Sequence, residues 1–113
     1  MAIETRTQDG VTIVKLTGKL GMGPALDQFN AAIQELLSQS RNRIVLDLEE
    51  MKAIDSSGIG MLVRHLTTAK RSGGAIKLYN PGPMIVQSLK MVGLLNLFPT
   101  YQDLRSAVAS FVE

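Results

Sequence analysis

The sequence predicts an α/β fold in which helices pack on a mixed sheet. Three features predict it: an N-terminal stretch where apolar and polar residues alternate, later stretches whose apolar residues recur at helical spacing, and short apolar runs between those stretches. With 113 residues, 45% of them hydrophobic and 19% charged, the chain has the size and composition of one folded domain. We therefore expect residues 1–113 to form a single domain with a four- to five-stranded mixed sheet and about four helices, in the order ββαβαβα(β)α.

The first twenty residues predict a β-hairpin followed by an irregular connection. Residues 2–8 alternate apolar or β-branched side chains with polar ones, and a second strand is expected over Val11 to Thr17. Between them, Asp9 and Gly10 tolerate the positive φ of a two-residue turn. The glycine-rich stretch GKLGMG at 18–23 cannot easily hold regular structure, so we interpret it as a tight strand-to-helix connection.

The middle of the chain predicts two helices, the second of them between two parallel strands. Pro24 fits the first turn of a helix whose apolar stripe is Leu26, Phe29, Ile33, Leu36 and Leu37. A buried strand is expected over 44–48, with a polar connection through Glu49 and Glu50 to the apolar pair at 53–54. The second helix runs from Gly58 to the stop signal at 73–74 and leads to a strand over 75–79. Strand, helix and strand form a βαβ unit, which requires parallel strands.

The last third of the chain predicts two more helices. The first is expected over Met84 to Val92, with Val86, Leu89 and Val92 facing inward. Leu97 and Phe98 are candidates for a short last strand. Thr100 stands three residues before Asp103, a spacing close to a capping box, so its hydroxyl is expected to cap the final helix, with Leu104, Val108 and Phe111 inward.

The composition excludes several classes of protein. There are no cysteines, so disulfides, cysteine zinc sites, iron–sulfur clusters and thiol nucleophiles are excluded. No apolar stretch approaches the roughly 20 residues of a bilayer span, and the N-terminus lacks a signal-peptide core, so we expect a cytoplasmic protein with no direct membrane insertion. The chain carries a net charge of −2 through Ser57 and +4 from Gly58 onward, but it has no basic run and no aromatic series, so no nucleic-acid partner is expected.

The tetrapeptide Asp55-Ser56-Ser57-Gly58 carries the most functional information, because it lies where a strand leaves the sheet and a helix begins. Asp and Ser are preferred helix N-caps, so capping alone explains the motif. The same position also offers exposed amide N–H groups and the positive end of a helix dipole to a phosphate on Ser56. Both interpretations remain open at this point.

No catalytic residue, metal site or cofactor site is expected. The single histidine, His65, is nine residues from Ser56, which on one helix means the opposite face and a rise of about 13.5 Å. We interpret it as a surface residue. The acids Asp47, Glu49, Glu50 and Asp55 are the available metal ligands, but neighbouring acids at a strand end usually face solvent. Neither the dinucleotide-binding G-x-G-x-x-G nor the P-loop pattern occurs.

The stretch PGPMIVQSLKMVGLLNLF at 81–98 is unusually apolar for a segment that begins with a loop. Most of it is expected in the core. The alternative is an exposed partner surface beside the Asp55–Gly58 corner, to which the flexible Met84 and Met91 are suited.

Nearly the whole chain resembles a STAS domain of the anti-sigma factor antagonist family. The resemblance rests on the set LTGKL, IVLDL, MKAIDSSGIGML, RSGGAIKL and MVGLLNLF, in that order along the sequence. It implies a STAS-like fold and a bacterial regulator that is not an enzyme. Such a domain is a substrate and ligand of a serine kinase that doubles as an anti-sigma factor.

The resemblance also implies a mechanism and a site. The unphosphorylated domain binds the kinase, phosphorylation on Ser56 releases it, and a serine phosphatase resets it; Ser57 is the fallback acceptor. The implied partner-binding residues are Asp55, Ser56, Ser57, Gly58 and Ile59, together with Gly21 and Met22.

One position departs from the family pattern. Members commonly carry an acid after the G-x-L at the end of the second strand, whereas Gly18-Lys19-Leu20 is followed here by Gly21. The alternative is therefore a STAS interaction module that is not phosphorylated, such as a scaffold or a regulatory subunit of a lipid-transport complex. An unrelated small hydrolase is the remaining class.

Overall fold

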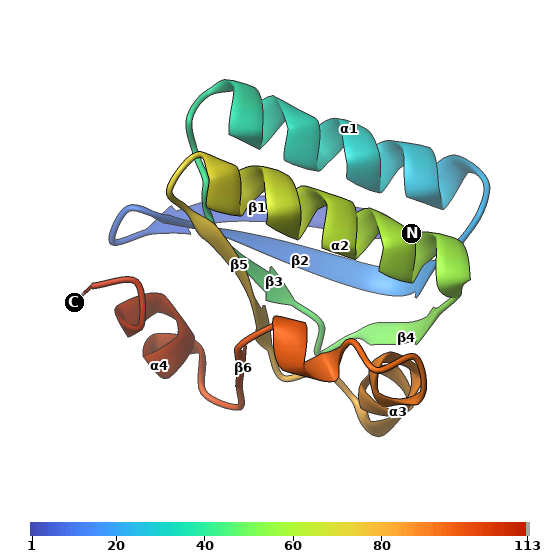
Figure 1. Cartoon of the computed structure of the whole chain (residues 1–113). Helices are drawn as coiled ribbons and strands as arrows, with labels where there is room; N and C mark the ends of the chain where they lie inside the picture. Colours follow the sequence, from blue (N-terminus) through green and yellow to red (C-terminus); the bar gives the residue numbers. More distant parts are fainter. Residues whose placement is uncertain (113) are drawn as a thin grey trace.

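The computed structural model describes residues 1–112, which form a mixed sheet with helices on both faces (Figure 1). The elements in chain order are β1 (Ala2–Gln8), β2 (Val11–Leu20), α1 (Pro24–Ser38), β3 (Arg43–Asp47), β4 (Met51–Ile54), α2 (Ser56–Arg71), β5 (Ala75–Tyr79), α3 (Pro83–Met91), the 3₁₀ turn η1 (Leu95–Leu97), β6 (Thr100–Tyr101) and α4 (Leu104–Ala109). The predicted α/β class is confirmed, with six strands where four to five were expected.

The sheet is parallel except at one edge. Its order is β1-β2-β3-β5-β6, and β4 pairs with the end of β2 off that path. Only β1, which is antiparallel to β2, departs from the common strand direction. Asp9 and Gly10 both have positive φ, 52° and 79°, so the predicted hairpin turn is confirmed. The predicted βαβ unit is confirmed as well, because β3 and β5 pair in parallel across α2.

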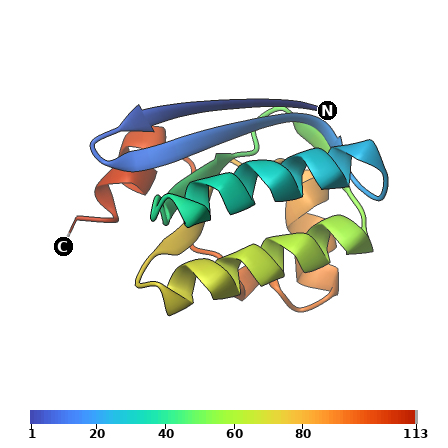
Figure 2. The same cartoon turned by 90° about the horizontal axis from the view of Figure 1, so that it is seen from above.

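Two hydrophobic clusters lie on opposite faces of the sheet. The larger packs α1, α2 and α3 against the sheet, and the predicted stripe of α1 faces it through buried Phe29, Ile33 and Leu36. The smaller lies under α4 and contains Val11, Ile13, Val45, Ala107 and Val108. Figure 2 shows α1 and α2 side by side over one face, with α4 beyond the other. Parallel strands buried on both faces explain the continuous apolar run of β3.

The predicted polar connection through Glu49 and Glu50 forms a turn between β3 and β4. The Leu48 amide donates to the Tyr79 carbonyl (3.0 Å), the Glu49 amide to Asp47 Oδ1 (3.1 Å) and the Met51 amide to the Leu48 carbonyl (3.1 Å). This turn sends β4 away from β5 to the last three residues of β2, so Gly18, Lys19 and Leu20 pair with β4. The expectation that all of 18–23 lacks regular structure is therefore wrong for its first half.

The structure of the C-terminal third differs from three of the predictions: the position of the last strand, the cap of α4 and the inward face of α3. Residues 95–97 form a 3₁₀ turn and the last strand is Thr100–Tyr101, so the predicted strand at Leu97 and Phe98 is wrong. The apolar side chain of Phe98 belongs to the core although its backbone is not in a strand. The cap of α4 is the Asp103 carboxylate, which accepts from the Ser106 amide at 3.0 Å, and Thr100 instead donates its hydroxyl to the Phe98 carbonyl.

The inward face of α3 is the third correction. Of the three predicted inward residues, Leu89 is buried, Val86 is half-buried and Val92 is 53% exposed. The second buried residue of the helix is Ile85. The helix begins at Pro83 and ends at Met91, so Val92 lies past its last turn.

Candidate functional site

The candidate site is the corner at which α1 and α2 both begin (Figure 1). Strands β2 and β4 pair in parallel with Leu20 opposite Ile54. The loop 21–23 that follows β2 and the segment 55–58 that follows β4 therefore leave the sheet side by side. This adjacency brings together the two groups of residues that the sequence analysis selected.

Asp55 connects the two segments. Its Oδ1 accepts the Gly58 amide at 2.9 Å, which is the N-cap bond of α2, and its Oδ2 accepts the Met22 amide at 3.0 Å. These bonds from Gly58 and Met22 hold the pKa of the Asp55 carboxyl below its usual value, and the nearby Lys19 ammonium adds to the effect. The carboxylate is thus charged and fixed in place. The capping interpretation of Asp55 is confirmed.

The two serines are the first residues of α2. Ser56 is exposed and Ser57 is half-buried, and no hydrogen bond among residues 1–112 uses either hydroxyl. Ser56 therefore presents an accessible hydroxyl on a rigid helix terminus. That position suits a reaction carried out on the serine by another protein.

Two glycines allow the corner to close. A Cβ on Gly58 would lie 2.5 Å from the Leu20 carbonyl oxygen, so only glycine lets α2 approach the end of β2 this closely. A Cβ on Gly21 would lie 2.7 Å from Asp55 Oδ2. The Asp55 carboxylate thus occupies the space that a side chain at 21 would need. Because residue 21 is glycine, the carboxylate can lie this close to the loop.

The accessible part of the corner is narrower than the predicted set. Gly21, Gly58 and Ile59 are buried and offer almost no surface, so they support the corner from below. Met22 is 79% exposed beside Asp55. Lys19, which the sequence analysis did not select, is exposed and lies near both Gly21 and Asp55; only the pairing of β2 with β4 brings it there.

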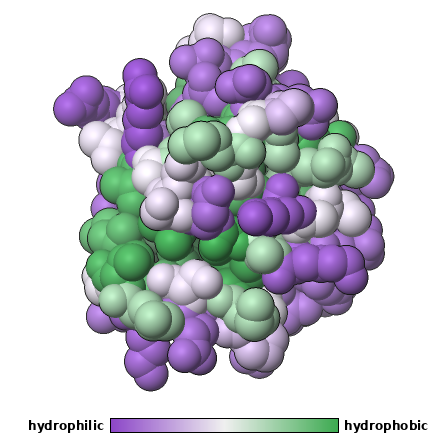
Figure 3. Space-filling view, turned by 90° about the vertical axis from the view of Figure 1, so that its right-hand side faces the viewer, coloured by the Kyte–Doolittle hydropathy of each residue, from purple (hydrophilic) through white to green (hydrophobic). Residues whose placement is uncertain are grey.

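The segment 81–98 divides between core and surface. Ile85, Leu89 and Phe98 are buried, while Met84 and Met91 are 66% and 77% exposed. Figure 3 looks at the side on which α1 and α2 begin and shows apolar surface interrupted by polar side chains. The core expectation is therefore confirmed for Ile85, Leu89 and Phe98, while the partner surface at Met84 and Met91 stays a prediction.

His65 is buried, which corrects the prediction of a surface residue. It is 3% exposed, and its ring packs edge-to-face on Phe29 with centroids 5.7 Å apart. Burial lowers the pKa of the His65 imidazole to about 4. The error arose because α2 faces α1 as well as the sheet, so its buried stripe is wider than the apolar pattern indicates. His65 has no contact with the serines through which to activate them.

The acidic candidates have structural partners. Asp47 is 7% exposed, against expectation, because it lies between paired strands and accepts the Glu49 amide. Glu49 accepts from Asn80 at 3.2 Å, and Glu50 pairs with Lys15 at 3.0 Å. Within residues 1–112, no three acidic or histidine side chains are grouped as metal ligands would be. None of the helices in this part of the chain has the length and apolar character of a membrane span.

Comparison with known proteins agrees with this fold. A STAS domain family model matches residues 2–107. The anti-sigma F factor antagonist of Paenibacillus polymyxa is 28% identical over 104 residues, which cover 91% of this chain and 88% of that protein. An anti-sigma-factor antagonist (STAS) domain protein of Planctomyces limnophilus has a TM-score of 0.87 at 20% identity, covering 98% of each chain. The Bacillus cell fate determinant SpoIIAA in its phosphorylated form has a TM-score of 0.76 at 22% identity, covering 96% of this chain and 98% of that one. The chain belongs to the STAS domain family.

Proposed function

We propose that this protein is an anti-sigma factor antagonist that works by partner switching. Unphosphorylated, it binds a serine kinase that is also an anti-sigma factor. Phosphorylation on Ser56 releases it, and a serine phosphatase restores the binding form. In this proposal the protein acts in the cytoplasm, is not itself an enzyme, and uses neither a metal nor a cofactor.

One observation carries the proposal: the exposed Ser56 hydroxyl begins α2 on a corner held by the Asp55 carboxylate. A kinase must bring the γ-phosphate of ATP in line with a hydroxyl that solvent can reach. Fixing α2 and loop 21–23 through one carboxylate presents that hydroxyl in a constant position. The relatives named as anti-sigma factor antagonists supply the class of partner.

The charge at the corner explains the release. A phosphoserine adds about −1.5 to −2 charge at neutral pH. Asp55 already carries a negative charge beside Ser56, and Met22 presents apolar surface next to it. A partner that packs on Met22 and Ser56 would have to desolvate both negative groups after phosphorylation. Release therefore requires no change of fold.

The helix terminus makes the phosphorylated form stable. Amide N–H groups in the first turn of a helix and its dipole favour a negative charge. Lys19 lies near Asp55 and supplies a cation on the same side. The phosphate is accommodated without unfolding α2, so the modified and unmodified domains differ mainly in surface charge.

Gly21 supports a second candidate function. With no acid at this position, the corner lacks a side chain that commonly stands beside the serine in this family. A STAS module that binds its partner without modification, as a scaffold or a subunit of a transport complex, would not need that acid. The two candidates differ in whether charge at Ser56 controls binding.

Binding measurements on Ser56 variants distinguish the two. Calorimetric titration against each serine kinase anti-sigma factor of the same genome should find one that binds the unmodified chain. We expect Ser56→Ala to bind like the wild type and Ser56→Asp to bind about tenfold more weakly or worse, since a buried unpaired charge costs over about 1.4 kcal/mol. Ser40→Asp is the matched control and should bind like the wild type, because Ser40 is exposed beyond the opposite end of α1 from the corner. Equal binding by Ser56→Asp and wild type would favour the unmodified module.

A further inference from the structure

Strand β1 forms an open edge of the sheet. It is the first strand in the sheet order and lies along the outer edge of the sheet in Figure 2. Six of its seven residues are exposed. Its register with β2 runs unbroken from Ala2 opposite Thr17 to Gln8 opposite Val11. Proline, bulges and charged side chains are the usual devices that block pairing at a sheet edge. The strand has no proline and no bulge, and its two charged side chains, Glu4 and Arg6, have opposite signs.

The hairpin turn determines which backbone groups of β1 are free. A two-residue turn with positive φ at both positions makes Gln8 and Val11 a hydrogen-bonded pair. Bonded and non-bonded pairs alternate along an antiparallel ladder, so even-numbered residues of β1 bond to β2 and the odd-numbered ones point outward. Within residues 1–112, no backbone hydrogen bond outside the helices and strands involves β1. The amides and carbonyls of Ile3, Thr5 and Thr7 therefore face solvent.

We propose that β1 pairs antiparallel with β1 of a second copy of this chain, in a register centred on Thr5. The outward groups of Thr5 then bond to Thr5 of the second copy, and those of Ile3 and Thr7 bond to each other across the two-fold axis. Between these bonded pairs, Glu4 lies opposite Arg6 of the second copy, and Arg6 opposite its Glu4. Both are non-bonded positions, where antiparallel side chains lie closest.

The charges of β1 select this register over its neighbours. If one β1 strand shifts along the other, odd-numbered residues must stay opposite odd-numbered residues to keep the hydrogen bonds. The nearest alternative registers therefore have their two-fold axis at residue 4 or at residue 6. The first places Glu4 opposite Glu4 of the second copy, and the second places Arg6 opposite Arg6. Like charges directly opposite are destabilising, whereas the register centred on Thr5 makes two opposite-charge pairs.

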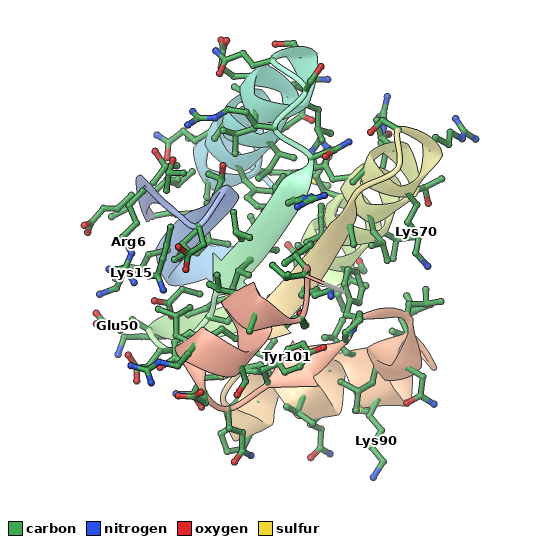
Figure 4. The ribbon with its side chains drawn as sticks, turned by 90° about the vertical axis from the view of Figure 1, so that its left-hand side faces the viewer. Arg6, Lys15, Glu50, Lys70, Lys90 and Tyr101 are labelled. Carbon is green, nitrogen blue, oxygen red and sulfur yellow. The ribbon has the colours of Figure 1, made fainter. Side chains whose placement is uncertain are left out.

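The proposed pairs extend a row of alternating charge that already crosses the sheet. Asp47 lies opposite Lys15 in the β2–β3 register, and Lys15 lies opposite Glu4 in the β1–β2 register. Arg6 of the second copy would follow Glu4 with the sign that continues the alternation. Figure 4 shows Arg6 and Lys15 on one side of the molecule, with Glu50, the ion-pair partner of Lys15, beside them.

Charge variants of the whole chain test the proposal. Sedimentation equilibrium over a wide concentration range should give a wild-type mass that rises from one copy toward two; the range must reach high concentrations, because one strand pair is a small interface. Glu4→Arg and Arg6→Glu each turn both cross-strand pairs into repulsions. We expect each variant to dissociate at about tenfold higher concentration or to remain a monomer.

A variant that misfolds could also fail to dimerise, so two further samples test whether restoring opposite charges restores the dimer. An equimolar mixture of Glu4→Arg and Arg6→Glu restores opposite charges at both positions, and so does the double variant; both should regain the wild-type dimer. Thr5→Pro removes only an outward amide and should abolish the dimer while leaving the β1–β2 ladder intact. A wild type that is monomeric throughout, or single variants that dimerise like the wild type, would overturn the proposal.

Discussion

Gly58 is the residue at which the corner is most sensitive to substitution. In Gly58→Ala, the new methyl group would lie 2.5 Å from the Leu20 carbonyl oxygen and 2.8 Å from Ile54 Cγ1, so α2 must move away from the sheet. We expect a loss of about 2–3 kcal/mol in the free energy of unfolding. Chemical denaturation of the purified variant measures it.

Gly60 supplies the matched control on the same helix. A Cβ there meets nothing within 4 Å, and alanine has the higher helix propensity. Gly60→Ala should therefore stabilise the protein by about 0.5–1 kcal/mol. If both variants changed stability alike, the close approach of α2 to β2 would not be the cause.

His65 makes stability depend on pH. Its pKa falls from 6.5 to about 4 on folding, so the unfolded chain takes up the proton first as the pH falls. The stabilisation from the neutral imidazole is complete above pH 6.5 and is lost as the pH falls through about 4, a difference of about 3 kcal/mol.

His65→Phe tests this dependence. Phenylalanine keeps an aromatic ring against Phe29 and carries no titratable proton. Unfolding free energies of both proteins, measured at a series of pH values, should diverge between pH 6.5 and about 4, with the wild type falling more steeply. Parallel curves would mean that His65 titrates alike in the folded and unfolded chains.

Helix α4 has six residues, so its terminus contributes much of its stability. The Asp103 carboxylate caps it by accepting from the amide and the hydroxyl of Ser106, and these bonds lower the pKa of that carboxyl. Asp103→Ala leaves the first turn without an acceptor. We expect the amides of α4 to exchange with solvent several-fold faster, as hydrogen–deuterium exchange measures.

The control for that change is Asp103→Asn, which keeps a side-chain oxygen at the cap. Its exchange should stay close to that of the wild type. Since α4 covers Val11, Ile13 and Val45, the alanine variant should also expose these residues transiently. Unchanged exchange in the alanine variant would show that packing alone holds α4.

The elements that follow from one strong local pattern could be predicted from the sequence. The hairpin, α1, α2 and β5 each have a clear period and a turn or cap residue at their ends. Strand β6 could not be predicted, because it has only two residues. Its position depends on residues distant in the sequence: the Asn80 amide donates to the Tyr101 carbonyl, and the Leu78 amide donates to the Pro99 carbonyl. The separation of β4 from β3 depends likewise on Tyr79.

The candidate site likewise has features that local sequence predicts and features that depend on tertiary structure. That Asp55 caps α2 and that Ser56 begins it could be predicted, because both are local consequences of the residue types. The bond from Met22 to Asp55, the approach of Lys19 and the burial of Gly58 could not, because all three need β2 to pair with β4. The same limit applies to His65, whose burial depends on α1.

The molecule as a whole has two surfaces to which we assign different roles. Helices cover both faces of the sheet, the corner at 21–23 and 55–57 presents Ser56, and β1 leaves one edge open. The corner and the edge belong to different elements, so partner switching and self-association can be tested independently. A Ser56 variant leaves β1 untouched, and a charge variant of β1 leaves Asp55 and its two hydrogen bonds in place.

The most direct test of the switch is to locate the phosphate. The chain is incubated with Mg-ATP and each serine kinase anti-sigma factor of its genome, then cleaved after lysine and arginine. Cleavage yields the peptide AIDSSGIGMLVR, residues 53–64, whose only hydroxyl side chains are Ser56 and Ser57. Fragmentation in the mass spectrometer should place a single phosphate on Ser56, and Ser56→Ala should abolish it. A chain that binds one of these kinases but carries phosphate on neither serine would contradict the switch.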